Sequence, residues 1–509
     1  MPDGPVIALL QTAAIPIVRQ PVIIAVGIAY FLACAAIGWW AARRTHTTED
    51  FFVAGRSIGL VPFALAAMAA TLSGFAFIGG PGLVYAIGMT AVFIILPASI
   101  TNTAGAWVLG KRMRLLGEVR RLVTVPDAIG ARYRSPAAQG LSAIAILVGV
   151  VGYIAANMLA LGLVVDALFG VGLVTGIWIG TAVTLAYSAS GGILAGIYTD
   201  VFQGLLMAIA SSLVFVFALD SGGGLAAITR TLQAADPAFL GPWGTRGAMV
   251  ALSFFFVFAV GSLGQPHIAH KYYMLKDARR LKWYPALMTI AMLLAQLLFV
   301  SVGIAMKSLV VSGSVAPLQR ADDATPLFLL SHVPVFVAAL VFAGVAAAIM
   351  STVNSFLSVG AAAITHDLPK AFGVLAKENR NQLRSGRLWT VVLSILAAIL
   401  AQSSGTLVAF LGIFGYGLFA CTLVPALAIG LNWEGATREG AIASITLGLT
   451  MTLALETAAW LRLVSLPTGV TISGLTLVLS MLTFLGVSWL TRARAAAQLD
   501  ADVRMVMET

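Results

Sequence analysis

The sequence predicts an all-α membrane protein with 13 transmembrane helices, and three observations lead to this prediction. Of the 509 residues, 60% are hydrophobic and only 10% are charged, whereas a soluble domain carries about 25% charged residues. Apolar runs long enough to cross a hydrocarbon core of about 30 Å occur thirteen times. Lys and Arg gather in alternate connections between these runs, as expected when every second connection lies on the same side of a membrane.

The thirteen runs follow one another along the whole chain. The first 21 residues contain Pro5, Pro16 and Pro21, so we interpret them as an interfacial lead-in rather than a span. The run at residues 327–365 is too long for one upright crossing, so part of it should leave the membrane or tilt strongly. The spans are expected near residues 22–42, 59–80, 84–110, 141–165, 171–189, 194–219, 247–268, 284–306, 327–365, 388–404, 407–430, 440–460 and 468–490.

The basic residues also predict the orientation of the chain. With the N-terminus outside, the connections on the inner side hold 24 Lys and Arg residues and those on the outer side hold 6. Because positive charge concentrates on the cytoplasmic side of membrane proteins, we expect the N-terminus outside and the C-terminus in the cytoplasm. The same distribution accounts for the net charge of +10, so the lipid bilayer is the expected partner and nucleic acid is not.

The connections between the spans and the two cysteines give weaker indications of structure and function. The connection at residues 220–246 combines glycines, prolines and Trp243, and we expect an ordered lid or a short surface helix there. Cys34 and Cys421 lie inside apolar runs, so they indicate neither a disulfide framework nor a metal site. The segment after the last span is short, and we expect no catalytic or signalling domain in it.

Two spans contain clusters of residues that weaken a helix. In span two, residues 69–74 read Ala-Ala-Thr-Leu-Ser-Gly, and the Gly-Gly-Pro-Gly at residues 79–82 is expected to end the span. In span seven, residues 261–267 read Gly-Ser-Leu-Gly-Gln-Pro-His. Gly and Pro are common in membrane helices, which is the simpler explanation. Interruptions five spans apart, however, favour a midplane binding site between two inverted five-helix halves, where unwound carbonyls contact an ion or substrate.

Span nine carries a stripe of small residues and side-chain oxygens. The members are spaced i, i+3, i+4 and i+7, so they share one face of a helix. They are Ala348, Ser351, Thr352 and Ser355, with Asn354 on an overlapping face. Tight helix packing is one interpretation, with the hydroxyls bonded back to their own helix. The other interpretation is a site for a hard cation, which takes oxygen ligands when it loses water. The interrupted span two favours the cation site.

Only two acidic side chains lie inside the predicted spans. Asp200 is about six residues from the inner end of span six, which corresponds to a depth of roughly 9 Å. Acids inside a membrane are functional candidates by default, so Asp200 is one. Glu456 lies near the outer end of span twelve and is interpreted as structural. His267 and His366 lie at the ends of spans seven and nine, where we expect boundary residues.

Taken together, several motifs resemble the sodium:solute symporter family along nearly the whole chain, although each alone is unspecific. They are residues 50–57, Leu72-Ser73-Gly74 with Pro81-Gly82, residues 191–203, Gly264-Gln265-Pro266-His267, and residues 348–352. The resemblance implies a bacterial inner-membrane carrier with the five-plus-five inverted-repeat core of the leucine-transporter type. The implied divisions are a lead-in with an extra helix, two repeats, and two C-terminal helices with a short cytoplasmic tail, at residues 1–42, 59–219, 247–430 and 431–509.

The resemblance also implies where sodium binds. The main site would use the backbone carbonyls of two residues in span two, together with one carbonyl and two hydroxyls in span nine. These residues are Ala69, Leu72, Ala348, Ser351 and Thr352. Some family members have a second sodium site, which here would fall on Asp200, Ser351, Asn354 and Ser355. Asn354 stands where a hydroxyl residue is usual, although an amide oxygen can also coordinate sodium.

A small polar solute is expected to bind beside the two interruptions. The substrate-binding residues would be Thr71, Ser73, Gly74, Phe258, Ser262 and Gln265. The Gly-Gln-Pro-His motif is closest to the proline-carrier branch, but those carriers have Asp at the position of Thr71, and Trp and Tyr at the positions of Phe258 and Ser262. Proline is therefore not favoured. An amino acid or small carboxylate could bind the exposed N–H groups of span two.

We therefore expect a sodium-coupled secondary active symporter that imports this solute by alternating access. We expect no cofactor, with sodium as the coupling ion and the only metal. A proton-coupled or uncoupled carrier on the same fold is one alternative, and a transporter-like sensor is another. An enzyme is not expected, because the spans contain no Ser/His/Asp or paired-carboxylate arrangement.

Overall fold

The computed structural model describes residues 20–43, 54–188, 193–374, 380–405, 407–464, 466–467 and 469–509. The expected lead-in before Gln20 lies outside the described residues. The same is true of residues 50–53 and 191–192, which belong to two of the family-like motifs.

The described part of the chain is helical, and its one β-type contact is an isolated bridge between Ile58 and Leu275. Eleven of its helices are long and apolar enough to cross a membrane, and two shorter apolar helices cover Leu60–Thr71 and Leu173–Ala186. The prediction of an all-α membrane protein is therefore confirmed, while the exact count of thirteen spans stays a prediction.

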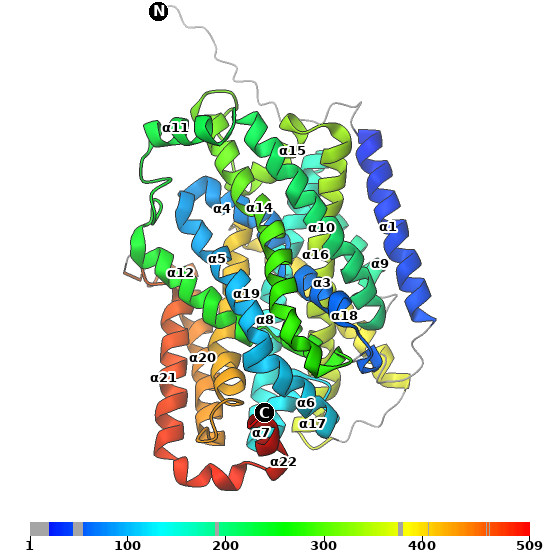
Figure 1. Cartoon of the computed structure of the whole chain (residues 1–509), viewed down its shortest axis with the longest axis vertical. Helices are drawn as coiled ribbons and strands as arrows, with labels where there is room; N and C mark the ends of the chain where they lie inside the picture. The colour runs from blue at the N-terminus through cyan, green and yellow to red at the C-terminus, as the bar shows by residue number, and fades with distance from the viewer. Residues whose placement is uncertain are drawn as a thin grey trace, which may run out of the picture.

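Most of the long helices run side by side in one bundle (Figure 1). They are α1 (Gln20–Ala42), α5 (Val92–Gly105), α8 (Pro136–Phe169), α9 (Leu173–Ser188), α10 (Ile193–Ser221), α12 (Gly247–Gly261), α14 (Tyr284–Val311), α16 (Val335–Ala362), α18 (Arg380–Ser403), α19 (Val408–Leu423), α20 (Arg438–Trp460) and α21 (Ile472–Leu490).

Short helices occupy the two ends of the bundle (Figure 1). One end carries α11 (Leu225–Ala235) and α15 (Ala324–His332), and we call it the α11 end. The other, the α22 end, carries the C-terminus and four short helices. These are α6 (Lys111–Val119), α7 (Val125–Tyr133), α17 (Leu368–Ala371) and α22 (Ala501–Met507). Helix α11 lies in the connection where we expected a lid or a surface helix.

The long run at residues 327–365 is divided between two helices, while the expectation that part of it leaves the membrane or tilts strongly stays a prediction. Helix α15 ends at His332, the chain turns at Val333 and Pro334, and α16 begins at Val335. The proline has no N–H group and sits just before the first turn of the new helix, where that group is not needed. Helix α16 then packs against α10, α8 and α1, which places its hydroxyl stripe inside the bundle.

Span two is interrupted where the sequence predicted. Helix α3 (Leu60–Thr71) ends at Thr71, Leu72 is extended with φ −89° and ψ 116°, and a π-helical turn begins at Phe75. The prediction that residues 79–82 end this span is wrong, because helix α4 (Gly80–Ile87) starts there and continues to Ile87. Pro81 lies in the first turn of α4, where a proline is tolerated.

The glycines of this segment serve close packing instead of helix termination. A Cβ atom at Gly79 would lie 2.9 Å from the backbone nitrogen of Ala409, and one at Gly80 would clash with the ring of Phe299. Only residues without side chains allow α4 to approach α19 and α14 this closely.

Span seven is interrupted in the same manner. Helix α12 ends at Gly261, a single 3₁₀ turn covers Ser262–Gly264, and Gln265 is extended with φ −73° and ψ 108°. Helix α13 (Pro266–Lys271) then begins with its proline in the first turn. Helix α13 packs against both α3 and α16. The two interrupted spans therefore meet next to the hydroxyl stripe of α16.

Candidate ion and substrate site

His267 joins the two interruptions. Its Nε2 atom lies 3.1 Å from the carbonyl oxygen of Ala70, and its ring packs on that of Phe356 with centroids 4.1 Å apart. Because a carbonyl can only accept, this contact requires a proton on Nε2. The expectation that His267 is a boundary residue is wrong, since the side chain is 4% exposed. Helix α13 starts one residue earlier and turns this side chain into the bundle.

Thr352 reaches the same break from α16. Its hydroxyl lies 3.2 Å from the carbonyl oxygen of Leu72 and 3.4 Å from that of Ala70. Thr352 and Leu72 are both buried. Ala69 and Ala348, whose carbonyls we expected to take part, are fully buried on α3 and α16. The carbonyl of Ala70 is an additional oxygen that the sequence analysis did not include.

This group of oxygens suits a dehydrated alkali cation. The oxygens are neutral, buried and contributed by one interrupted helix and one continuous helix. A hard cation takes oxygen ligands of this kind, and neutral ligands avoid the cost of burying a further charge. A break in a helix also leaves carbonyls free of intrahelical bonds, so they can turn toward an ion.

Ser351 is adjacent in sequence but points toward another partner. Its hydroxyl donates to Oδ1 of Asp200 at 2.6 Å, and Nζ of Lys271 lies 2.8 Å from Oδ2 of the same carboxylate. Asp200 and Lys271 are 1% and 5% exposed. From the sequence, Lys271 was expected in an inner connection, and its pairing with Asp200 was not predicted. The signal was available, because an acid inside a membrane usually has a basic partner.

Asn354 and Ser355, the other expected members of a second ion site, also gather here. Both are half-buried and line a cavity of about 20 Å³ together with Asp200, His267 and Lys271. A cavity of this size holds about one water molecule. Asn354 lies directly against α10, because a Cβ atom at Gly196 would come within 2.7 Å of its Nδ2 atom.

Ser73 and Gly74 are held by α8. The hydroxyl of Ser73 lies 3.3 Å from that of Tyr153, and the N–H group of Gly74 donates to Oδ1 of Asn157 at 2.9 Å. Ser73 also accepts from the N–H group of Phe75. One of the N–H groups expected to be open for a carboxylate therefore already has a protein partner. Asn157 was detectable in the sequence as an amide inside an apolar span, but we did not single it out.

Phe258 belongs to a stack of aromatic rings beside the break. Its ring is nearly parallel to those of Phe75 and Tyr416, with centroids 5.9 Å and 4.4 Å away. The Tyr416 hydroxyl donates to the carbonyl of Phe258 at 3.0 Å, which links α19 to α12. Stacking of this kind is worth about 0.5–1.5 kcal/mol per pair beyond burial. Phe75 and Tyr416 were not predicted as members of the site.

The three remaining polar candidates divide into two kinds. The hydroxyls of Thr71 and Ser262 bond back to carbonyls of their own helices, at Ala67 and Ala259, which is the ordinary behaviour of such residues. Gln265 differs, because its Nε2 atom donates to Gly261 at 3.0 Å while its buried Oε1 atom has no hydrogen-bond partner. A buried acceptor without a partner is costly, so Gln265 is the strongest candidate to contact a ligand donor.

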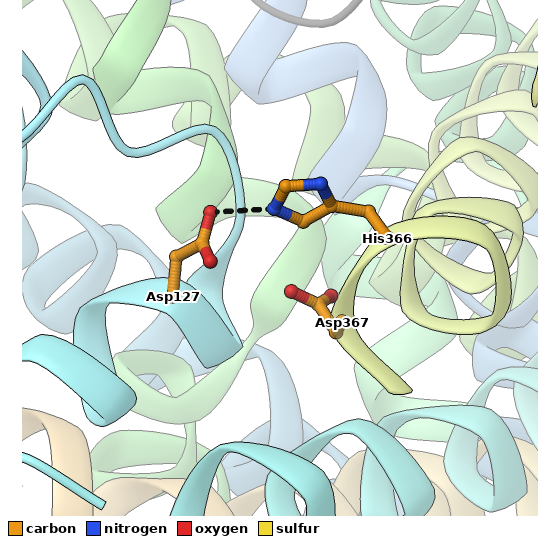
Figure 2. A group of neighbouring side chains, drawn as sticks. All are labelled: Asp127, His366 and Asp367. Atoms are coloured by element: carbon orange, nitrogen blue, oxygen red, sulfur yellow. Dashed lines mark hydrogen bonds and ion pairs between the residues drawn. The ribbon is translucent and has the colours of Figure 1, made fainter. Parts of the chain in front are cut away.

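A charged cluster lies at the α22 end, and Figure 2 shows three of its members, Asp127, His366 and Asp367. Oδ2 of Asp127 in α7 lies 3.0 Å from Nε2 of His366, and Oδ1 lies 2.7 Å from Nζ of Lys370. Burial alone would raise the pKa of Asp127, but His366 and Lys370 hold it well below its usual value. With Asp367 the group has metal-ligating side chains. Because Lys370 already neutralises Asp127, we interpret the cluster as an ionic link between α7 and the helical turns that follow α16, from His366 to Lys370 in α17.

A second carboxylate, Asp322, lies at the α11 end. Its Oδ2 atom accepts from the N–H group of Val408 at 2.7 Å, at the first turn of α19, while its buried Oδ1 atom has no partner. Burial raises the pKa of Asp322 to about 7. A Cβ atom at Gly82 would lie 2.7 Å from Oδ1, so this carboxylate sits between α4 and α19.

Two interrupted helices that face a continuous helix across neutral oxygens are typical of ion-coupled secondary transporters. Comparisons with known proteins agree with this class of protein. Residues 51–448 match the model of the sodium:solute symporter family. The chain belongs to this family, and the predicted resemblance is confirmed. It is a sodium-coupled solute transporter and not an enzyme.

Among the similar curated proteins is the osmoregulated proline transporter OpuE of Bacillus subtilis, 28% identical over 439 residues that cover 85% of this chain and 88% of that protein. Another is the sodium/pantothenate symporter of Escherichia coli, 27% identical over 431 residues that cover 83% and 88%. A third is the sodium/proline symporter of Escherichia coli, 28% identical over 448 residues that cover 85% and 88%.

Two solved structures have a similar fold. A sodium-coupled sialic acid symporter in a substrate-bound outward-open state aligns with a TM-score of 0.74 at 18% identity, over 93% of this chain and 98% of that one. A nucleobase-cation-symport-1 family transporter aligns with a TM-score of 0.52 at 15% identity, over 91% and 99%. These likenesses support the expected leucine-transporter-type architecture.

Proposed function

We propose that this protein is a bacterial inner-membrane symporter in which sodium bound between α3 and α16 drives import of a small amino acid or carboxylate. The observation that carries the proposal is the contact of the Thr352 hydroxyl with the carbonyls of Leu72 and Ala70 at the break in α3. The concentration of basic residues supports a cytoplasmic α22 end and an N-terminus outside.

The proposed sodium site combines the ligands expected from the sequence with the carbonyl oxygen of Ala70, which lies beside them. The hydroxyl of Ser351 donates its hydrogen to Asp200, and its lone pairs stay available to a cation. Thr352 and the carbonyls of the break complete the oxygen group. The proposed ligands are Ala69, Ala70, Leu72, Ala348, Ser351 and Thr352.

Sodium bound here would couple to solute binding through the break itself. Leu72 would contact the ion, while Ser73 and Gly74, the next two residues, are fixed to α8 by Tyr153 and Asn157. An ion that fixes the break therefore also fixes the proposed solute site. Coupling of this kind is reciprocal, so a tenfold increase in solute affinity with sodium corresponds to about 1.4 kcal/mol and an equal effect on sodium.

The proposed solute site lies beside the aromatic stack. Phe258 offers an apolar surface, and Oε1 of Gln265 offers an acceptor for a donor group such as an ammonium. Proline and pantothenate, the substrates named for the relatives, both carry a carboxylate, which supports this solute class. The proposed contact residues are Thr71, Ser73, Gly74, Phe258, Ser262 and Gln265.

Alternating access needs a closure at each end of the bundle. At the α11 end, Asp322 links the segment before α15 to the first turn of α19 and contacts α4. At the α22 end, Asp127 links α7 to His366 and Lys370 in the helical turns that follow α16. We propose that these two polar links open in turn, while the break in α3 changes its position between them.

Transport by the purified protein in liposomes tests the proposal. A thermal-shift screen with amino acids, small carboxylates, polyols and ureides, with and without sodium, first finds the solute. The stabilising solute should then accumulate when a sodium gradient is imposed without a pH gradient. Accumulation that follows an imposed pH gradient and ignores sodium would instead establish the proton-coupled alternative.

A further inference from the structure

We propose that the ammonium group of Lys271 takes the place of a second coupling cation, so that this transporter binds one sodium ion per chain. The inference rests on the proposed function and deepens it, because it assigns the sodium stoichiometry. It starts from the buried carboxylate of Asp200, the acid around which a second sodium ion would bind.

Both oxygens of this carboxylate are already paired. Oδ2 lies 2.8 Å from Nζ of Lys271, and Oδ1 accepts a hydrogen bond of 2.6 Å from Ser351. Asp200 and Lys271 are almost fully buried. A buried charge is stable only when an opposite charge balances it. For Asp200 that opposite charge is the ammonium group of Lys271, a side chain of α13.

The other expected ligands of a second ion surround the same ammonium group. Asn354 and Ser355 line the small cavity in which Asp200 and Lys271 meet. The cavity of about 20 Å³ has room for roughly one water molecule. Among the residues that line it, Asp200 is the only acid. A sodium ion added here would place two positive charges against one negative charge.

The position of Lys271 also indicates the structural role of its positive charge. Lys271 is the last residue of α13, Asp200 lies on α10, and Ser351 lies on α16 next to Thr352. The pair therefore joins three helices close to the proposed sodium site, as a bound ion would. Unlike an ion, the ammonium group cannot leave with the solute, so it contributes no charge movement per cycle.

Equilibrium binding of ²²Na⁺ to the purified full-length protein tests the inference without a known solute. The wild type should bind one sodium ion per chain. Lys271→Gln removes the positive charge and leaves Asp200 and Ser351 in place, so this variant should bind two. The double variant Lys271→Gln with Asp200→Asn should return to one, because the carboxylate that attracts the second ion is gone.

Two controls separate charge from general damage. Lys271→Arg keeps the charge and should bind one ion, as should Lys282→Gln, which alters an exposed lysine. Two ions bound by the wild type would overturn the inference, and this count does not depend on any variant folding. A folded Lys271→Gln protein, judged by its melting transition, that still binds one ion would overturn it as well. No sodium bound by the wild type would instead contradict the proposed function.

Discussion

Replacing Thr352 by Ala is the sharpest perturbation of the proposed sodium site. The side chain is fully buried, and its hydroxyl contacts the carbonyls of Leu72 and Ala70 at 3.2 Å and 3.4 Å. The carbonyl of Ala70 keeps its contact with His267 in this variant, whereas the carbonyl of Leu72 loses the hydroxyl that it meets in the wild type. Loss of a buried polar partner costs about 1–3 kcal/mol.

The free energy of sodium binding should weaken by a similar amount, because the Thr352 hydroxyl is also a proposed ligand of the ion. Since about 1.4 kcal/mol corresponds to a factor of ten, sodium affinity should fall roughly 5- to 150-fold. The assay is a titration of ²²Na⁺ binding, followed by the sodium dependence of uptake in liposomes. Thr352→Ser keeps the hydroxyl and should stay close to the wild type.

A matched control lies in α9. Thr184 is also fully buried, but its hydroxyl donates to Gly180 in its own helix, so Thr184→Ala should leave sodium affinity nearly unchanged. A folded Thr352→Ala protein with wild-type sodium affinity would refute the assignment of this hydroxyl to the sodium site.

Three further predictions concern neighbouring features. Ser351→Ala should weaken sodium binding by about 1–3 kcal/mol, measured in the same titration, because it removes a proposed ligand and a hydrogen bond to Asp200. Gly74→Ala should lower the melting temperature, at a cost of about 1–3 kcal/mol, because the new Cβ atom would lie 2.7 Å from that of Ala160. The link made by Asp322 should be most stable at low pH and weaken as pH rises through about 7, because the folded pKa is raised to that value from 3.8. A spin-label pair across α4 and α19 should report this weakening between about pH 4 and 7, the interval between the two pKa values.

Two of these predictions have a control variant, and the third has a result that would contradict it. Gly38→Ala in α1 places its Cβ atom where no neighbour lies within 4 Å and should not lower the melting temperature. Asp322→Asn should abolish the pH dependence of the spin-label distance, and a pH response that persists would assign it to another group. Sodium binding by Ser351→Ala that equals the wild type would remove Ser351 from the ligand set.

Local sequence patterns determined the interruptions of the two spans, because glycine, proline and hydroxyl residues weaken a helix wherever they occur. The residues at 69–74 and 261–267 therefore predicted breaks that the structure contains. The same rule failed at residues 79–82. There the glycines allow close helix contacts and Pro81 begins a helix, and neither role can be inferred without the neighbouring helices.

The spacing of Ser351 and Thr352 placed their side chains near one face of α16, but spacing does not say what each side chain meets. Thr352 contacts the break in α3, whereas Ser351 contacts Asp200, because adjacent residues of a helix point about 100° apart. Likewise, the sequence indicated that Asp200 needs a partner, and only the tertiary structure brings Lys271 to it across 71 residues. Helix breaks follow from local chemistry, while the identity of a buried partner depends on how distant helices pack.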